Sequence, residues 1–160
     1  MELSELVARE QIRDTIARYS HAGDRGLAEE LAQQFLPDGV LEENSVGRLI
    51  GRAAIAGFIS AIAEGYGSAT TIEPPMVRHH VSNVCIAKLT HDRAQADSYF
   101  VVYGRHGVDH WGRYRDTLVP YEGRWLFEHR LVRVDAWVQA GMHAAWMSRQ
   151  MSRNEGAGNE

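Results

Sequence analysis

The pattern of apolar residues changes from a helical to a strand period after Pro74 and Pro75, and this change limits the fold more than any other feature. Four segments with the period of two that is typical of strands follow these prolines, at 76–89, 94–105, 110–121 and 124–134. The turns at 90–93 and 122–123 are short enough to make antiparallel hairpins. Helices followed by antiparallel strands predict an α+β domain, in which the helices lie on one face of a curved sheet and enclose a pocket.

Three helices are predicted before the strands. The first begins near Ser4, carries apolar residues at spacings of four and three up to Tyr19, and ends at Gly23. The second covers roughly 27–35, closed by 37–39, and a short strand follows at 40–43. The third begins at Gly51 and ends near Gly65, before a loop at 68–75. A last helix is expected beyond 135, and we expect one domain over 1–153 with a disordered tail at 154–160.

Composition excludes several classes of function. A chain of 160 residues suits a single domain, and 17 basic against 21 acidic side chains leave no basic footprint for nucleic acid. We also expect no membrane segment, because no apolar run approaches the roughly 20 residues that a spanning helix needs. The acidic N-terminus lacks the features of a signal peptide, and Cys85 is the only cysteine, so a reducing cytoplasm fits. Cys85 itself is expected in the core.

The strand at 77–84 contains the first candidate for chemistry. Alternation places His79 on the same face as Val77 and Val81, looking into an apolar interior. A buried ring nitrogen needs a hydrogen-bond partner, which is either a buried carboxylate or a backbone carbonyl. This strand alone does not separate an acid–base histidine from a core histidine.

Several local motifs, together with the order of the elements, resemble the SnoaL-like branch of the nuclear transport factor 2-like (NTF2-like) superfamily. That branch includes relatives of scytalone dehydratase, bile acid 7α-dehydratase and the lindane dehydrochlorinase. The resemblance covers about residues 5 to 135 and implies a cone-shaped, curved sheet of mixed or antiparallel strands. The matching motifs are Ala17-Arg18-Tyr19 with Gly23-Asp24, His79-x-x-x-Asn83, the segment 112–116, and Gly123-Arg124-Trp125 leading to Arg130.

The resemblance implies a dyad in which a carboxylate after the first helix orients a histidine on the strand after the third helix. These positions fall on Asp24 and His79. A carboxylate bonded to one imidazole nitrogen fixes the tautomer and stabilises the cation that forms when the other nitrogen takes a proton. Asp24 could instead cap the next helix. Tyr19 could donate a hydrogen bond to a substrate oxygen, or serve as an aromatic core residue.

Other side chains are candidates for binding. Arg130 lies among valines on the last strand and suggests an anion or carbonyl clamp, or the buried partner of a carboxylate. Tyr114 and Asp116 share one strand face and are expected to line the cavity. An apolar wall or lid that would admit a ring-containing substrate is expected from Phe58, Ile62 and Trp137.

Metal and cofactor sites are not predicted. His106 and His110 flank a turn with Asp109, but their spacing matches no known ligand set, so we expect no metal. Phosphate loops, nucleophile elbows and cofactor fingerprints are absent from the sequence. This pattern favours acid–base chemistry by side chains alone, without cofactors.

Three functions remain open. The leading interpretation is a cofactor-independent lyase of the dehydratase type, with His79 as the base. The alternative is an isomerase or cyclase of the ketosteroid isomerase and polyketide cyclase type, in which Tyr19 with Asp116 polarises a carbonyl and Glu43 shuttles the proton. The third is a module that only binds a small ligand. A homo-oligomer, dimer or trimer, is expected because the strand at 94–105 is apolar on both faces.

Overall fold

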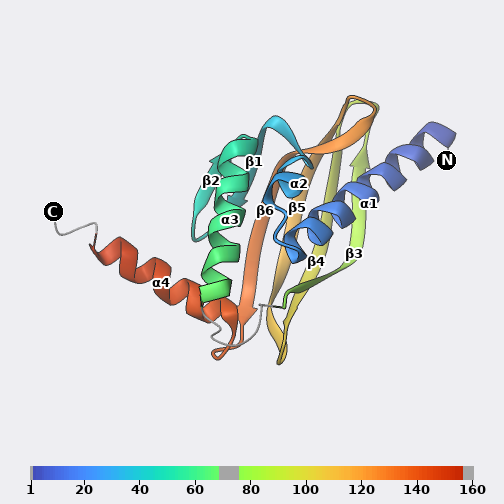
Figure 1. Cartoon of the computed structure of the whole chain (residues 1–160). Coiled ribbons are helices and arrows are strands. Elements are labelled where there is room, and N and C mark those ends of the chain that lie inside the picture. The colour runs from blue at the N-terminus through green and yellow to red at the C-terminus, as the bar shows by residue number, and fades with distance from the viewer. Residues whose placement is uncertain (1, 69–75, 157–160) are drawn as a thin grey trace.

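The computed structural model describes residues 2–68 and 76–156. In this part of the chain, helices lie against one face of a curved six-stranded sheet, as predicted for an α+β domain (Figure 1). The elements in chain order are α1 (Leu3–Asp24), α2 (Ala28–Ala32), β1 (Phe35–Glu43), β2 (Gly47–Ile50), α3 (Arg52–Ser68), β3 (Arg78–Leu89), β4 (Ala94–Gly104), β5 (Gly107–Tyr121), β6 (Arg124–Trp137) and α4 (Met142–Gly156).

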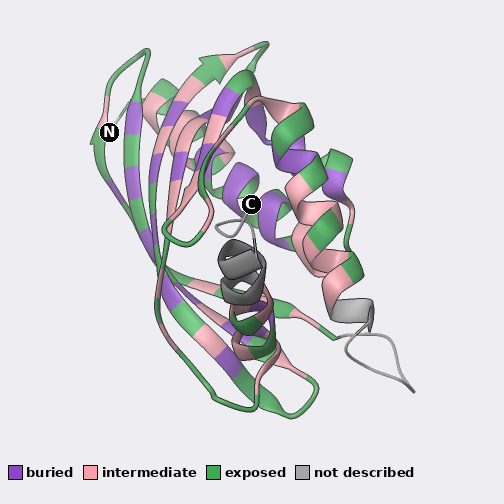
Figure 2. Cartoon of the chain, turned by 90° about the vertical axis from the view of Figure 1, so that its left-hand side faces the viewer, coloured by how far each residue is buried: buried purple, intermediate pink, exposed green. Residues whose placement is uncertain are grey.

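The sheet is mixed, with the strand order β2-β1-β6-β5-β4-β3. Both predicted hairpins are present, since β3 pairs with β4 and β5 with β6 in antiparallel fashion, and a third turn joins β4 to β5. β1 pairs in parallel with β6 and so lies between β6 and the edge strand β2. Figure 2 shows that the helices cover one side of the curved sheet, with buried residues where the layers meet. The expected curved mixed sheet is therefore confirmed.

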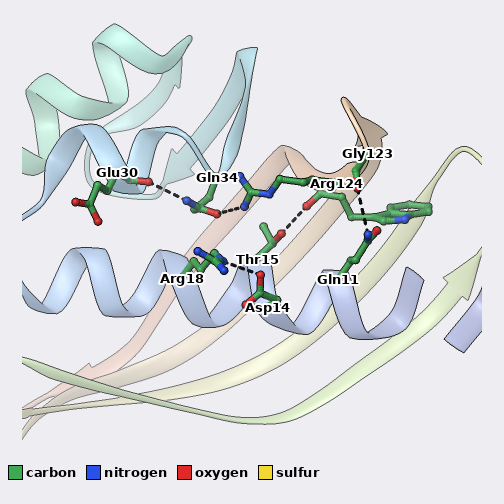
Figure 3. A network of polar contacts seen from close by, with 9 residues as sticks. Gln11, Asp14, Thr15, Arg18, Glu30, Gln34, Gly123 and Arg124 are labelled. Atoms are coloured by element: carbon green, nitrogen blue, oxygen red, sulfur yellow. Dashed lines mark hydrogen bonds and ion pairs between the residues drawn. The ribbon is translucent and has the colours of Figure 1, made fainter. Parts of the chain in front are cut away.

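Helix α1 is fixed on the sheet by its buried face and by two hydrogen bonds. Ile12, Ile16 and Tyr19 are buried at the predicted spacings of four and three. On the same helix, the Thr15 hydroxyl donates to the carbonyl of Trp125 at 2.5 Å, and the Gln11 amide donates to the carbonyl of Gly123 at 3.1 Å (Figure 3). Both acceptors lie at or beside the β5–β6 turn, so these hydrogen bonds attach α1 to that turn. They thereby fix where Asp24, the last residue of α1, lies over the sheet.

The second helix is shorter than predicted. It ends at Ala32, and Phe35 already belongs to β1, where it is fully buried and pairs with Phe127 of β6. The pairing of β1 with β6 is irregular between Phe35 and Val40, which accommodates Pro37 because proline cannot donate to a ladder. The strand β2 was not predicted, and α3 extends to Ser68. The loop predicted at 68–75 lies, beyond Ser68, outside the described residues.

The last helix begins later than predicted. The expectation of a helix from Asp135 is wrong, because Asp135 and Trp137 still belong to β6 and α4 begins at Met142. Asp135 instead accepts hydrogen bonds from the Arg113 guanidinium on the neighbouring strand. α4 continues to Gly156 and so includes the start of the expected tail, whereas 157–160 lie outside the described residues. No described helix is both long and apolar enough to cross a membrane.

Register shifts interrupt the strict alternation of the strands. One lies between Ser82 and Cys85, where Asn83 has a positive φ of 53°, and beyond it Cys85 is exposed, so its predicted core position is wrong. Another separates Phe127 from His129 on β6. Strict alternation would place Phe127 and Arg130 on opposite faces, but both are buried, because a bulge adds one residue to the strand and exchanges its faces.

The second long strand, β4, alternates as predicted. Phe100 and Val102 are buried, whereas Tyr99 and Tyr103 are 53% and 36% exposed on the outer face of the sheet. Trp111 on β5 lies beside this row, because it pairs with Val101. The outer face of β4 and β5 is thus partly aromatic in the single chain.

Gly112 provides a test of how tightly β5 and β6 pack. A Cβ atom at this position would lie 2.0 Å from the carbonyl oxygen of Arg133 and 2.9 Å from Cζ of Phe100. Since the first contact is with backbone, the strands must separate to admit it. We expect Gly112→Ala to lower the free energy of unfolding by about 3 kcal/mol or more, measured by urea denaturation.

Gly57→Ala is the matched control for this substitution. Gly57 is exposed on α3, and a Cβ there would meet nothing within 4 Å. Alanine is the better helix former, so this change should raise the free energy of unfolding by about 0.5–1 kcal/mol. Similar small effects from both substitutions would contradict the close packing at Gly112.

Candidate functional site

Asp24 and His79 meet where the end of α1 lies beside the start of β3. Oδ1 of Asp24 is 2.7 Å from Nδ1 of His79. The backbone N–H of His79 also donates to both carboxylate oxygens, at 3.0 and 3.2 Å. The Asp24 carboxylate therefore binds both the backbone of β3 at His79 and the imidazole ring of His79. With its Nδ1 proton donated to Asp24, the neutral ring keeps a lone pair on Nε2.

The simpler interpretations of both residues do not describe these contacts. No side-chain hydrogen bond caps α2, so Asp24 does not act as the cap of that helix. The ring of His79 bonds to a carboxylate rather than to a backbone carbonyl. The His79 side chain remains 21% exposed, and that of Asp24 11%, so the pair is accessible from a cavity.

A cavity of about 320 Å³ lies between the sheet and the helices, and Asp24 and His79 form part of its wall. Its volume is within the range of small-molecule sites. The remaining wall is mainly apolar and includes Leu31, Leu41, Phe58, Ile59, Ile62, Val77, Phe100, Val132, Val134 and Trp146. The polar side chains that line the cavity together with the pair are those of Tyr19, Ser20, Arg25, Glu43, His110, Tyr114 and His143. The site suits a largely apolar molecule that presents one or two polar groups.

Arg130 lies behind this wall and is fully buried. Its Nε and Nη2 donate to the two oxygens of Asp116 at 2.8 and 2.7 Å. Its guanidinium carbon is 4.2 Å from the ring centre of Tyr19 and 4.1 Å from that of Tyr114. Of the roles considered for Arg130, the partner of a buried carboxylate is the one its contacts describe. Neither Arg130 nor Asp116 lines the cavity.

The two tyrosines on Arg130 do line the cavity. Burial raises the pKa of the Tyr19 hydroxyl, although the positive charge of Arg130 opposes this. Burial likewise raises the pKa of the Tyr114 hydroxyl, and the neighbouring Tyr19 adds to the effect. Both phenols therefore keep their protons at neutral pH and can act as hydrogen-bond donors.

The expected apolar wall is partly in place. Phe58 and Ile62 line the cavity, whereas Trp137 does not. Trp137 is at the end of β6, is 38% exposed, and lies 5.4 Å from the ring of His143. Trp146 of α4 takes the place expected for Trp137 and packs edge-on against Phe58, with 6.4 Å between ring centres.

A second carboxylate–imidazole pair lies on the same cavity, beside the start of α4. Oδ2 of Asp109 is 2.7 Å from Nδ1 of His110, and the ring of His143 stacks on that of His110 with 4.5 Å between centres. Both histidines line the cavity. From the sequence, Asp109 and His110 were candidates only as metal ligands with His106, and His143 was not a candidate. His143 lies three residues before Trp146 on the same helix, and this spacing, which puts both side chains on one face, was the available signal.

Comparisons with known proteins agree with this architecture. Residues 4–131 match the model of the SnoaL-like domain family. A protein of known structure from Catenulispora acidiphila is 31% identical, with a TM-score of 0.72 over 84% of this chain and 96% of that chain. A proposed scytalone dehydratase from Novosphingobium aromaticivorans is 26% identical, with a TM-score of 0.70 over 86% and 91%.

LinA shares the fold at 15% identity, with a TM-score of 0.72 over 85% of this chain and 91% of that chain. No curated protein sequence matches the chain. The family match spans most of the described elements, from α1 into β6.

The buried ring of His143 makes stability depend on pH. Burial and the charge of His110, opposed by Asp109, lower the pKa of His143 from 6.5 to about 4. In the unfolded chain, His143 therefore takes up a proton as the pH falls below 6.5. In the folded chain, it takes up that proton only near pH 4. We expect the free energy of unfolding to fall by about 2 kcal/mol between pH 7 and pH 5 from this group.

The measurement is urea denaturation at both pH values, in the wild type and in His143→Phe. Phenylalanine keeps an aromatic ring for the stack but cannot titrate. The variant should lose about 2 kcal/mol less than the wild type over this interval. Equal losses in the two proteins would show that His143 is not held neutral by the fold.

Proposed function

The chain belongs to the SnoaL-like domain family, and we propose that it is a cofactor-independent lyase that acts by elimination on a small, largely apolar cyclic substrate. The observation that carries this proposal is the 2.7 Å contact between Asp24 and His79 in the wall of an apolar cavity. The likeness to a proposed scytalone dehydratase at 26% identity supports the reaction class.

In the proposed reaction His79 is the general base. Nε2 takes a proton from a carbon next to an activating group, and the C–H electrons form the new double bond as the leaving group departs. Asp24 holds Nδ1 and stabilises the imidazolium that results, through a charge-assisted hydrogen bond. In this proposal Tyr19 and Tyr114, which line the cavity, donate hydrogen bonds from their phenols to the oxygen of the activating group.

An isomerase or cyclase is the second candidate, because Glu43 also lines the cavity. Its carboxylate accepts a hydrogen bond from the backbone N–H of Ser45 at 2.9 Å and could shuttle a proton. The other part of that mechanism is less well supported. Both oxygens of Asp116 are bonded to Arg130 behind the wall, so Asp116 is not placed to polarise a carbonyl with Tyr19. A module that only binds a ligand would need no oriented base.

Substitutions at the dyad test the lyase. Turnover should fall by about a hundred- to ten-thousand-fold in His79→Ala, because a positioned base is removed. Asp24→Asn should also be severe, because an amide can hold the wrong tautomer and does not stabilise the cation. Conversion of a panel of apolar cyclic alcohols and ketones is measured by the mass of the products.

His80→Ala is the matched control, because His80 is exposed on the opposite face of β3 and packs on Tyr103. It should keep near-parental activity. A larger loss in Glu43→Gln than in His79→Ala would favour the isomerase. Near-parental activity in both dyad variants would remove the lyase assignment.

We also propose that two or three copies of the chain associate through the outer face of the sheet. The exposed aromatic side chains of Tyr99, Tyr103 and Trp111 lie on neighbouring positions of β4 and β5 there. Light scattering at micromolar concentration should give the mass of a dimer or trimer, and Tyr99→Glu should lower that mass by placing a charge in the contact. A monomeric mass for the wild type would contradict the proposal.

A further inference from the structure

The pair Asp109–His110 depends on a β-bulge. Adjacent residues on a regular strand point to opposite faces, so their side chains cannot meet. Here Val102 of β4 pairs with His110, whereas Tyr103 pairs with Val108, and Asp109 is the extra residue between them. The bulge turns the carboxylate toward the ring, and the 2.7 Å contact results.

The carboxylate is also anchored from α4, independently of His110. The backbone N–H groups of Met142 and His143 donate to its two oxygens. Gly141 leaves room for this approach, because a Cβ there would lie 2.5 Å from Oδ1 of Asp109. Burial alone would raise the pKa of Asp109, but the hydrogen bonds from His110 and Met142 outweigh it and lower the pKa. Asp109 therefore stays ionised beside His110.

His79 and His110 lie in one row across the sheet. Val102 pairs with His79 on one side and with His110 on the other, so two strand spacings, about 10 Å, separate the two backbones. The ring of Phe100 lies between them, 6.4 Å from that of His79 and 5.9 Å from that of His110. A six-membered ring seated on Phe100 would have one imidazole on each side.

His143, the other histidine of the stack, is kept neutral by its surroundings. The pKa of His143 is lowered to about 4, chiefly by burial and then by the charge of His110. The charged or titratable groups that face His110 are Asp109, His143 and, beyond Phe100, His79. β4 and β6 present the apolar side chains of Phe100 and Trp137 to it.

We propose that His110, positioned by Asp109, is the general acid that protonates the leaving hydroxyl group while His79 removes the carbon-bound proton. The inference rests on the proposed function and names its substrate class, a β-hydroxy ketone on a six-membered ring. The C–H bond breaks toward Nε2 of His79, its electrons form the C=C bond, and the C–O bond breaks. The oxygen takes the Nε2 proton of His110 and leaves as water. Solvent then removes the proton from His79 and returns one to His110.

The test compares two leaving groups, because chloride departs without protonation and hydroxide does not. The probes are 3-hydroxycyclohexanone and 3-chlorocyclohexanone, which both give cyclohex-2-enone, measured by its ultraviolet absorption after subtraction of the uncatalysed rate. His110→Gln should lower the enzymatic rate on the hydroxy compound by about a hundredfold or more and leave the rate on the chloro compound nearly unchanged.

Two variants separate this role from a structural one. In His79→Gln both reactions should be lost, since both need the base. His91→Gln should keep both rates and their ratio, because His91 lies exposed in another turn. Asp109→Asn is a poorer choice, because it also removes the contacts with the start of α4.

If His110→Gln leaves the hydroxy-to-chloro rate ratio unchanged while His79→Gln still loses activity, His110 is not the general acid. The proposed lyase function would then still be supported. Unchanged rates in His79→Gln, or conversion of neither ketone by the wild type, would overturn both for this substrate class. A nitrogen-15 NMR spectrum of the histidine rings gives a readout without turnover. In the neutral form of His110 the single ring proton should be on Nδ1, bonded to Asp109, so that Nε2 is the nitrogen that gains and donates the second proton. A neutral ring with its single proton on Nε2 would overturn the assignment.

Discussion

The buried ion pair between Arg130 and Asp116 constrains the elements around it. A guanidinium with no exposed surface is tolerated only when its charge is compensated, and removing the partner of such a pair typically costs several kcal/mol. Asp116 supplies that compensation from β5, while the rings of Tyr19, Tyr114 and Phe127 cover the guanidinium from α1, β5 and β6. Through Tyr19, this charge adds to the buried face and the hydrogen bonds that fix α1, and with it Asp24, over the sheet.

Two histidines on the cavity wall are held by the same chemistry with different local structures. His79 receives its carboxylate from the end of a helix, 55 positions earlier in the chain. His110 receives its carboxylate from the preceding residue, by way of a bulge. In both pairs the carboxylate also accepts backbone N–H groups, so it is positioned by the fold before it orients the ring. A ring held in this way is fixed in one tautomer, with its proton on Nδ1.

The sequence predicted what depends on periodicity and on recognisable motifs. The change of period after Pro75, the hairpins, and the meeting of Asp24 with His79 follow from local patterns or from the family resemblance. It could not predict what depends on single extra residues in strands. Cys85, Arg130 and the Asp109–His110 pair each follow a register shift, and a one-residue shift reverses the faces that alternation assigns. The strand at Phe35 was missed because Pro37, Asp38 and Gly39 are typical of turns.

The parallel pairing of β1 with β6 has a consequence for the order in which the fold is completed. Leu41 pairs with Arg130, so β1 cannot take its final place in the sheet until β6 has been synthesised. Contacts that distant in sequence slow folding, because the loop between them must be closed first. Leu41 and Glu43 belong to the cavity wall. The nascent protein therefore has no closed cavity until β6 has formed and paired with β1.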